Sequence, residues 1–230
     1  MSTMANHPKR QLEWRIVMAG DSALTVDFGS LIDRDINLRV VTIAARVQSM
    51  RLEGVRDIVP SYSAVTIYFD PLRTDVDRLW EALEMAAVEP VSGTCASREV
   101  LVPVRYGGSD GPDLAEVAAF ADCSIEQVIR LHTAHRYRVY MVGFLPGFPY
   151  LGTVDSRIAM PRRPSPRLAV PAGSVGIAGA QTGIYPTVAP GGWRLIGRAS
   201  MDAFDLTRES PSLFLPGDSV RFEAVSETIR

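Results

Sequence analysis

Residues 143–193 read GFLPGFPYLGTVDSRIAMPRRPSPRLAVPAGSVGIAGAQTGIYPTVAPGGW, and this stretch decides the fold of the second half of the chain. It holds 9 of the 18 glycines and 8 of the 16 prolines in less than a quarter of the 230 residues. Proline removes a backbone donor and glycine opens unusual φ values, so regular helix is excluded over most of the stretch. Composition alone favours a structural interpretation, in which proline-pinned loops wrap over a β-barrel.

Positive charge is concentrated in the same region of the sequence. Residues 157–198 hold six arginines and no acidic residue, which gives +6, whereas the rest of the chain has 18 basic against 26 acidic residues, or −8. The arginines are Arg157, Arg162, Arg163, Arg167, Arg194 and Arg198. Arginine forks and glycine-freed amides beside aromatic rings suit the binding of a small anion or a planar carbonyl compound. Because Arg162 and Arg163 lie between two prolines, extended backbone sends them to opposite sides, and at most one faces a given pocket.

The composition of the whole chain excludes several classes of protein. Hydrophobic residues make up 47% of the chain and no apolar run reaches about 18 residues, so we expect a soluble protein without a membrane span. The polar N-terminus lacks a secretory signal, and the expected location is cytoplasmic. A net charge of −2 gives no support for nucleic-acid binding. Cys95 and Cys123 lack metal-binding spacing and are expected to be separate structural thiols.

The first 92 residues are interpreted as a small α/β domain. Alternating apolar residues predict four strands, at 14–20, 23–28, 55–60 and 64–69. Asp33 is expected to cap a helix that runs to about Met50, with Gly54 as its stop. Thr74 is expected to cap a second helix that ends before Pro90. This order of elements predicts one sheet with both helices on one face, and it carries no catalytic signature.

A turn-rich segment around residues 89–97 separates a domain at 1–92 from a second one at 93–230. Strands are predicted in the second domain at 98–106, 137–144, 193–198 and 220–225. Pro112 and Ser124 are expected to begin two helices, the second with Gln127 at the capping-box position. Pro103 suggests that the first of these strands is an edge strand or carries a bulge. Short strands joined by Gly/Pro turns predict a small β-barrel, and the fold class of the chain is α+β.

Familiar catalytic motifs are weak in this sequence. Ser174 lies in AGSVG, where alanine replaces the first glycine of a nucleophile elbow, and a structural serine is the favoured interpretation. No P-loop or dinucleotide fingerprint is present, so ATP would need an unfamiliar or shared site. His132 faces the apolar side of its helix, where a hydrogen-bonded core histidine is favoured over an acid–base catalyst. His132 and His135 lack further ligands for a metal. Residues 181–186, QTGIYP, suit either a pocket or a polar turn.

Long motifs in a fixed order make the chain resemble a known family. They are GDSALTVDFG, VPSYSAVTIYFDP, YGGSDGPDLAEVA, RLHTAHRYRVYMVGFLPGFPYLG, PRRPSPR, VPAGSVGIAGAQTGIYP, PGGWRLIGR and FLPGDSVRF. The chain resembles the family that includes the 5-oxoprolinase B subunit, the so-called allophanate hydrolase subunit 1 and the kinase inhibitor KipI. The resemblance covers nearly the whole chain. It implies an N-terminal α/β domain followed by a cyclophilin-like β-barrel, a pair of domains that also occurs in the carboxyltransferase part of urea carboxylase.

The resemblance also implies a reaction and partners. Together with A and KipA-like C subunits, family members couple hydrolysis of ATP, used with Mg, to cleavage of 5-oxoproline to L-glutamate, and this chain would be inactive alone. The regulatory alternative is a KipI-like protein that inhibits autophosphorylation of a sensor histidine kinase through exposed aromatic residues. A third hypothesis, peptidyl-prolyl isomerase activity, rests on analogy with the barrel alone.

The chemistry of lactam cleavage narrows the candidate residues. A lactam is resonance-stabilised, so phosphorylation of its carbonyl oxygen would activate it, and the site needs cations, amides and an arginine for the carboxylate. The substrate- or anion-binding candidates are Arg163, Arg167, Gln181, Thr182, Gly183, Tyr185, Gly191, Gly192 and Arg194. The catalytic candidates are His132, Arg167, Gln181 and Tyr185. The aromatic candidates, for a pocket or a partner, are Phe144, Phe148, Tyr150 and Trp193. We expect no metal site and no cofactor bound by this chain alone.

Overall fold

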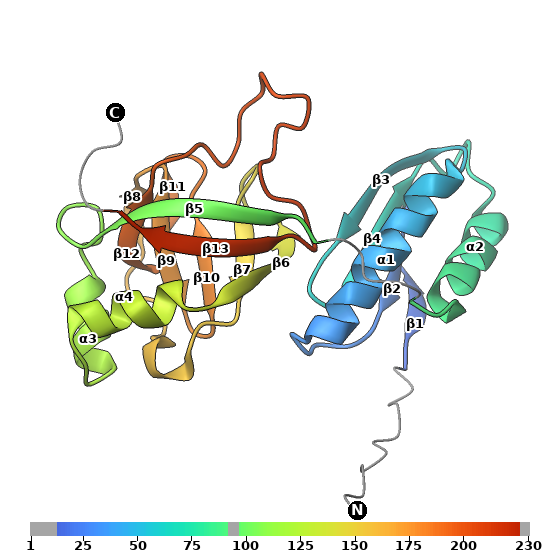
Figure 1. Cartoon of the computed structure of the whole chain (residues 1–230). Helices are drawn as coiled ribbons and strands as arrows, with labels where there is room; N and C mark the ends of the chain where they lie inside the picture. The colour runs from blue at the N-terminus through green and yellow to red at the C-terminus, as the bar shows by residue number, and fades with distance from the viewer. Residues whose placement is uncertain (1–12, 92–96, 226–230) are drawn as a thin grey trace, which may run out of the picture. The chain divides into compact units, whose positions relative to one another are not determined.

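In the computed structural model, residues 13–91 and 97–225 are described, and the chain divides into two units, 1–92 and 93–230 (Figure 1). Each unit has a hydrophobic core of its own. The predicted α+β class is confirmed. The predicted boundary and Cys95 lie in residues 92–96, outside the described residues. None of the helices in the described ranges has the length and apolar character needed to cross a bilayer.

The N-terminal unit is a four-stranded antiparallel sheet with two helices on one face (Figure 1). Its strands, in the order β1-β2-β4-β3, are β1 (Arg15–Met18), β2 (Ala23–Asp27), β4 (Ala64–Phe69) and β3 (Val55–Pro60). The helices are α1 (Arg34–Met50) and α2 (Val76–Val88). The alternating residues Leu24, Val26, Val65 and Ile67 are fully buried between sheet and helices, as the period-2 pattern predicts.

The caps of α1 show where local signals succeed and fail. Asp33 accepts hydrogen bonds from the N–H groups of the first turn, as predicted. The helix ends at Met50, as predicted, but the residue that stops it is Arg51, which takes a left-handed conformation with φ 47°, and not Gly54. Gly54 has φ +78° in the following turn, where a Cβ would collide with the hydroxyl of Thr74. Glycine is therefore required at position 54 because the segment of Thr74 packs against it, and not because α1 ends there.

The predicted cap of α2 at Thr74 is wrong by one residue. Asp75 is the cap, and its carboxylate accepts a hydrogen bond from the N–H of Arg78 at 3.1 Å. The hydroxyl of Thr74 donates instead to the carbonyl of Glu53 at 3.2 Å. Because the hydroxyl of Thr74 is used in this bond, it does not cap α2. The sequence alone does not show that Glu53 lies next to Thr74.

The second unit is a closed barrel in the strand order β10-β7-β6-β13-β5-β12-β9. Its strands are β5 (Glu99–Tyr106), β6 (Arg136–Val142), β7 (Pro149–Gly152), β9 (Ser174–Ala178), β10 (Gln181–Ile184), β12 (Arg194–Ala199) and β13 (Ser219–Ala224). The helices α3 (Leu114–Phe120) and α4 (Ile125–Thr133) are inserted between β5 and β6, and a short 3-10 helix covers Ser156–Ile158. The strands β8 (Arg167–Val170) and β11 (Ala189–Gly191) form a separate two-stranded sheet.

The stretch 143–193 is part of the barrel and not a wrap of loops around it. It supplies β7, β9 and β10 to the barrel and forms the β8–β11 sheet. The prediction of loops from composition is wrong because glycine also occurs inside strands, where it permits close approach of neighbouring strands and side chains. A Cβ on Gly183 would lie 2.8 Å from the carbonyl oxygen of Pro149 and 3.0 Å from the ring of Trp193.

Two further expectations for the barrel unit need correction. The strand that contains Pro103, β5, is paired on both sides, with β13 and β12, so it is not an edge strand. The proline is tolerated because the ladder with β12 begins one residue later, at Val104. The first helix starts at Leu114 after Asp113, two residues beyond the predicted Pro112.

The predicted capping box of α4 is present. Ser124 Oγ accepts from the N–H of Gln127 at 3.3 Å, and Gln127 Oε1 accepts from the N–H of Ser124 at 2.9 Å. Because both bonds satisfy donors that a helix start leaves free, Ser124→Ala should lower the free energy of unfolding of the barrel unit by about 1 kcal/mol. The exposed Ser165 serves as control, and Ser165→Ala should leave stability unchanged in urea unfolding followed by circular dichroism. Equal midpoints for the two variants would contradict the assigned cap.

Candidate functional site

A pocket of about 260 Å³ lies in the barrel unit, where several parts of the 143–193 stretch meet. It is lined by Phe144, Phe148, Tyr150, Arg162, Pro166, Tyr185, Pro190, Gly191, Gly192 and Trp193, and we call it the Arg162 pocket. Seven of these ten are candidates from the sequence. The structure therefore brings together the predicted aromatic residues and the predicted glycine pair.

Aromatic rings form the wall of the Arg162 pocket around Phe148, which is 1% exposed. Its ring centroid lies 4.9 Å from that of Tyr150, 5.2 Å from Tyr185 and 5.4 Å from Trp193. The interplanar angles are 60 to 88°, and edge-to-face contacts of this kind stabilise each pair by roughly 1 kcal/mol beyond simple burial. Phe144, by contrast, is 63% exposed. The wall is a fixed set of interlocked rings.

Two glycines line the pocket with backbone alone. A Cβ on Gly191 would collide with the hydroxyl of Tyr185, so a larger residue there would displace that ring. A Cβ on Gly192 would meet the carbonyl oxygen of Arg163 at 3.7 Å and Pro166 at 3.8 Å, which is ordinary contact. A Cβ at position 192 is therefore tolerated by the backbone, and a longer side chain there would start from the lining of the pocket.

The buried carboxylate of Asp113 binds two of the arginines that the sequence suggested for an anion. Arg167 donates to both carboxylate oxygens, at 2.9 and 2.7 Å, and Arg163 donates at 3.1 Å. The backbone N–H of Leu195 adds a hydrogen bond of 2.7 Å. Burial alone would raise the pKa of Asp113, but hydrogen bonds from Arg167 and Leu195 and the charges of both arginines outweigh it and lower the pKa. Arg163 and Arg167 are therefore held by the fold.

The other arginines of the acid-free segment 157–198 fall into two groups, those with an acidic partner and Arg162. Arg194 pairs with Glu116, Arg157 with Asp155 and Arg198 with Asp110. Among the ion pairs of the described ranges, none includes Arg162, whose guanidinium carbon lies 5.9 Å from the ring centroid of Trp193. Extended backbone between two prolines predicts that at most one of Arg162 and Arg163 faces a given pocket. The one that does so is Arg162, whereas the sequence candidate was Arg163.

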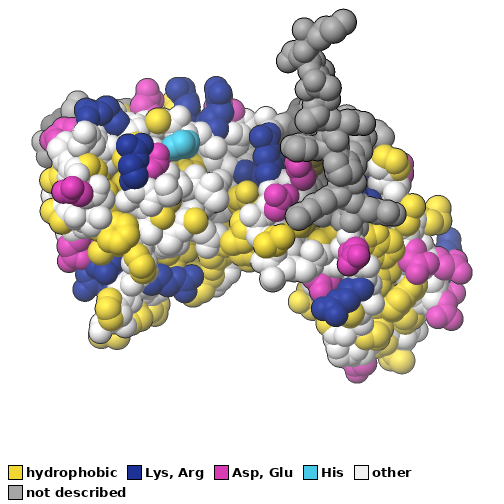
Figure 2. Space-filling view, turned by 90° about the horizontal axis from the view of Figure 1, so that it is seen from below, with side chains coloured by type: hydrophobic (Ala, Val, Ile, Leu, Met, Phe, Trp, Pro, Cys, Tyr) yellow, Lys and Arg dark blue, Asp and Glu magenta, His cyan; other side chains and the backbone are white. Residues whose placement is uncertain are grey.

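The acids that neutralise the arginine-rich segment come mostly from other parts of the sequence. Figure 2 shows one face of the barrel unit, on which basic and acidic side chains are interspersed. Ion pairs therefore offset much of the local excess of +6 in the sequence.

His132 and Thr182 lie in the barrel core and not in the Arg162 pocket, and both are 0% exposed. Thr182 Oγ1 donates to the carbonyl of Gly176 at 2.9 Å, so it accepts from His132 Nε2, also at 2.9 Å. The hydroxyl of Tyr106 then donates to Nδ1 at 2.7 Å. Burial, with a smaller contribution from the charge of His135, lowers the pKa of His132 from 6.5 to about 3. The ring is a neutral, satisfied core group.

The remaining candidates are also placed outside the pocket. Gln181 begins β10 and lies opposite Ala178 of β9. Gly183 lets the ring of Trp193 approach the barrel. Ser174 is 1% exposed in β9, and Cys123 is a half-buried free thiol. In residues 13–91 and 97–225, no group of three His, Cys, Asp or Glu side chains could hold a metal ion.

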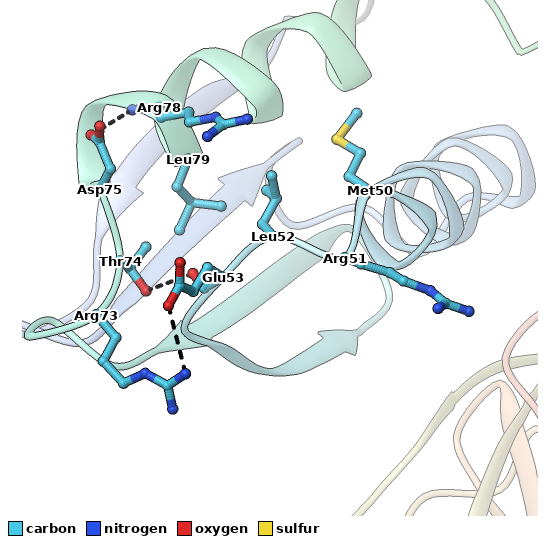
Figure 3. Close-up of a pocket in the computed structure, with 9 residues that line it drawn as sticks. All are labelled: Met50, Arg51, Leu52, Glu53, Arg73, Thr74, Asp75, Arg78 and Leu79. Carbon is cyan, nitrogen blue, oxygen red and sulfur yellow. Dashed lines mark hydrogen bonds and ion pairs between the residues drawn. The ribbon is translucent and has the colours of Figure 1, made fainter.

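A second pocket, of about 300 Å³, lies in the N-terminal unit between the end of α1 and the start of α2 (Figure 3). Arg51, Arg73 and Arg78 line it, but Figure 3 shows their guanidinium groups pointing away from one another. Arg73 lies 3.7 Å from Glu53, and their side chains are 65% and 79% exposed. Water screens such exposed charges, so this pocket has weaker means of holding a small ligand.

Comparison with known proteins places the chain in a family. Residues 14–214 match the family model of the carboxyltransferase domain, subdomain C and D. The 5-oxoprolinase B subunit of Bacillus subtilis (strain 168) is 39% identical over 227 residues, which are 94% of this chain and 95% of that protein. The 5-oxoprolinase B subunit of Escherichia coli O157:H7 is 41% identical over 222 residues, 94% and 98% of the two chains. The chain belongs to the family of 5-oxoprolinase B subunits. The resemblance seen in the ordered motifs is confirmed.

Several solved structures have a fold similar to that of this chain. TTHA0988 is 39% identical with a TM-score of 0.81, and the match covers 90% of this chain but 41% of that longer protein. PH0987 from Pyrococcus horikoshii is 44% identical over 93% of this chain and 98% of that one, with a TM-score of 0.55. The Kluyveromyces lactis urea carboxylase, at 19% identity and a TM-score of 0.75, shares the fold; the match covers 98% of this chain and 23% of that one.

The buried His132 makes stability depend on pH. Its folded-state pKa of about 3 lies below the ordinary 6.5, so the unfolded chain takes up a proton that the folded chain does not as pH falls below about 6.5. The free energy of unfolding should therefore decrease by about 2 kcal/mol between pH 7 and pH 5. His132→Gln should flatten this decrease in urea unfolding, whereas the surface variant His135→Gln should keep it. An unchanged slope in His132→Gln would contradict the assignment.

Removal of the Asp113 charge should destabilise the barrel unit. Asp113→Asn leaves Arg163 and Arg167 without their buried counterion, which costs about 3 kcal/mol in comparable buried pairs. Asp110 also pairs with two arginines but is more exposed, so Asp110→Asn should cost about 1 kcal/mol. Urea unfolding of the two variants measures the difference, and similar losses would refute the central role of Asp113.

Proposed function

We propose that this chain is the B subunit of an ATP-dependent 5-oxoprolinase complex, in which it acts with A and KipA-like C subunits. The observation that carries the proposal is the near full-length identity, 39% and 41% over 94% of the chain, to two proteins with this name. The match also covers 95% and 98% of those proteins, so it is not confined to one shared domain. The name of the relatives describes a hydrolase that has more than one subunit.

The reaction of the proposed complex is hydrolysis of a lactam. The carbonyl oxygen of 5-oxoproline takes the γ-phosphoryl group of ATP and ADP leaves. Water adds to the activated carbon, the ring C–N bond breaks, and a second water hydrolyses the resulting acyl phosphate to L-glutamate and phosphate. These steps need a place for the substrate carboxylate, cations around the phosphoryl group and an activated water.

The Arg162 pocket fits the first of these needs. It combines one arginine that has no acidic partner among the described residues with a wall of aromatic rings. We assign ATP, its Mg²⁺ and the activated water to a site that the partner proteins complete. On this proposal the chain contributes substrate contacts and is inactive alone.

Reconstitution tests the proposed function. The purified chain, mixed with the A and C subunits, ATP, Mg²⁺ and 5-oxoproline, should form glutamate and ADP, whereas the chain alone should form neither. Each mixture that lacks one of the three proteins is a control. Glutamate formation at the full rate without this chain would refute the proposal, and inhibition of a purified sensor kinase by the chain alone would support the KipI-like alternative.

A further inference from the structure

We propose that the Arg162 pocket is the substrate site of this protein, in which Arg162 pairs with the carboxylate of 5-oxoproline and the lactam ring lies against the aromatic wall. The inference rests on the proposed function, from which it takes the substrate. It adds the location of the site, the residue that recognises the charge and the orientation of the ligand.

The charge balance of the arginine-rich segment points to Arg162. Its five other arginines have acidic partners, and two of them share the buried Asp113. Arg162 is the member whose guanidinium meets an aromatic face instead, 5.9 Å from the centroid of Trp193. A guanidinium presents donors in a planar fork that matches a carboxylate, and a position over a ring does not use those donors. Arg162 can therefore take a carboxylate without breaking an ion pair of the fold.

The surroundings of Arg162 strengthen such a pair. Phe148, Tyr185 and Trp193 are 1%, 1% and 5% exposed, so one side of the pocket is a wall of packed rings. Charges interact more strongly beside such a wall than in bulk water. The field of Arg162 reaches the neighbouring phenols, because its charge acts on the pKa of both Tyr150 and Tyr185 against the effect of burial.

The half-buried phenol of Tyr150 lines the pocket beside the rings, whereas Tyr185 is 1% exposed and its phenol bonds the backbone of Trp193. Burial raises the pKa of Tyr150 and of Tyr185, so both hydroxyls keep their protons at neutral pH. A phenol donates one hydrogen bond and accepts others, which suits a ring that carries one C=O and one N–H. The pocket thus offers a cation for one end of the ligand and the polar ring of Tyr150 beside it.

Size and shape restrict the ligand to a small, flat molecule. A volume of about 260 Å³ lies below the range of roughly 300 to 1,000 Å³ that is usual for drug-sized ligands. Gly191 and Gly192 leave one side free of side chains, and Tyr185 stands against Gly191. A five-membered lactam with one carboxylate has this size and a nearly planar amide that packs on aromatic faces.

Titration calorimetry of the full chain with L-5-oxoproline tests the site directly. Arg162→Gln should weaken binding at least tenfold, and Arg162→Lys should restore part of the loss because it keeps the charge. Gly192→Leu should remove binding although Arg162 is intact, because the side chain occupies the pocket. 2-Pyrrolidinone, the same ring without the carboxylate, should bind the unaltered chain at least tenfold more weakly than 5-oxoproline.

Arg157→Gln is the matched control, because Arg157 belongs to the same acid-free segment, pairs with Asp155 and does not line the pocket. It should leave 5-oxoproline binding unchanged. In the reconstituted complex, Arg162→Gln should raise KM more than it lowers kcat, since the carboxylate contact is made in both the ground state and the transition state. Circular dichroism of each variant checks that the barrel is folded.

The outcomes separate this inference from the proposed function. If Arg162→Gln and Gly192→Leu both leave 5-oxoproline binding and KM unchanged, the proposed site is overturned. The proposed function still stands in that case if the complex forms glutamate. The proposed substrate site would also be overturned if the chain alone binds no 5-oxoproline and neither variant changes the KM of the complex for 5-oxoproline. A complex that forms no glutamate, although the chain binds 5-oxoproline with the expected variant effects, would overturn the function and leave the site.

Discussion

The buried carboxylate of Asp113 is the interaction on which the pocket depends. A carboxylate at 2% exposure is stable as an ion only with close cationic partners and hydrogen bonds, and Arg163, Arg167 and the N–H of Leu195 supply them. These contacts tie the residue before α3 to β12 and to the proline-rich segment 161–167. The N–H of Arg163 also donates to the carbonyl of Gly192 at 2.7 Å, which joins that segment to the glycine pair of the pocket.

The same pairing decides which arginine is available for chemistry. Two neighbouring arginines in an extended segment point to opposite sides, so once Arg163 is held by Asp113, Arg162 is directed away from it. Its guanidinium then lies over Trp193, a ring that packs on Phe148. The structural role of Arg163 thus leaves Arg162 to line the pocket.

Polar groups are buried in two different ways in the barrel unit. Asp113 stays charged because cations surround it, whereas His132 stays neutral because hydroxyl groups of Tyr106 and Thr182 satisfy both ring nitrogens. A neutral imidazole without access to solvent holds strands and helix together but exchanges no proton with a ligand. The two groups serve the barrel, and the Arg162 pocket is left with the aromatic residues, the glycine pair and one free cation among the described residues.

The sequence by itself determined the elements of the N-terminal unit and several helix starts, through patterns that act within a few residues, but it did not show that residues 143–193 supply barrel strands. Alternating apolar residues placed the strands of the N-terminal sheet, Asp33 and the Ser124–Gln127 pair marked helix starts, and the ordered motifs indicated the family. Only the tertiary structure decided which arginine lines the pocket and which arginines pair with Asp113. Asp113 lies 50 residues from Arg163 and 54 from Arg167, and barrel closure brings them within 3.1 Å. An ion pair depends on distance in space, and sequence spacing carries no record of it.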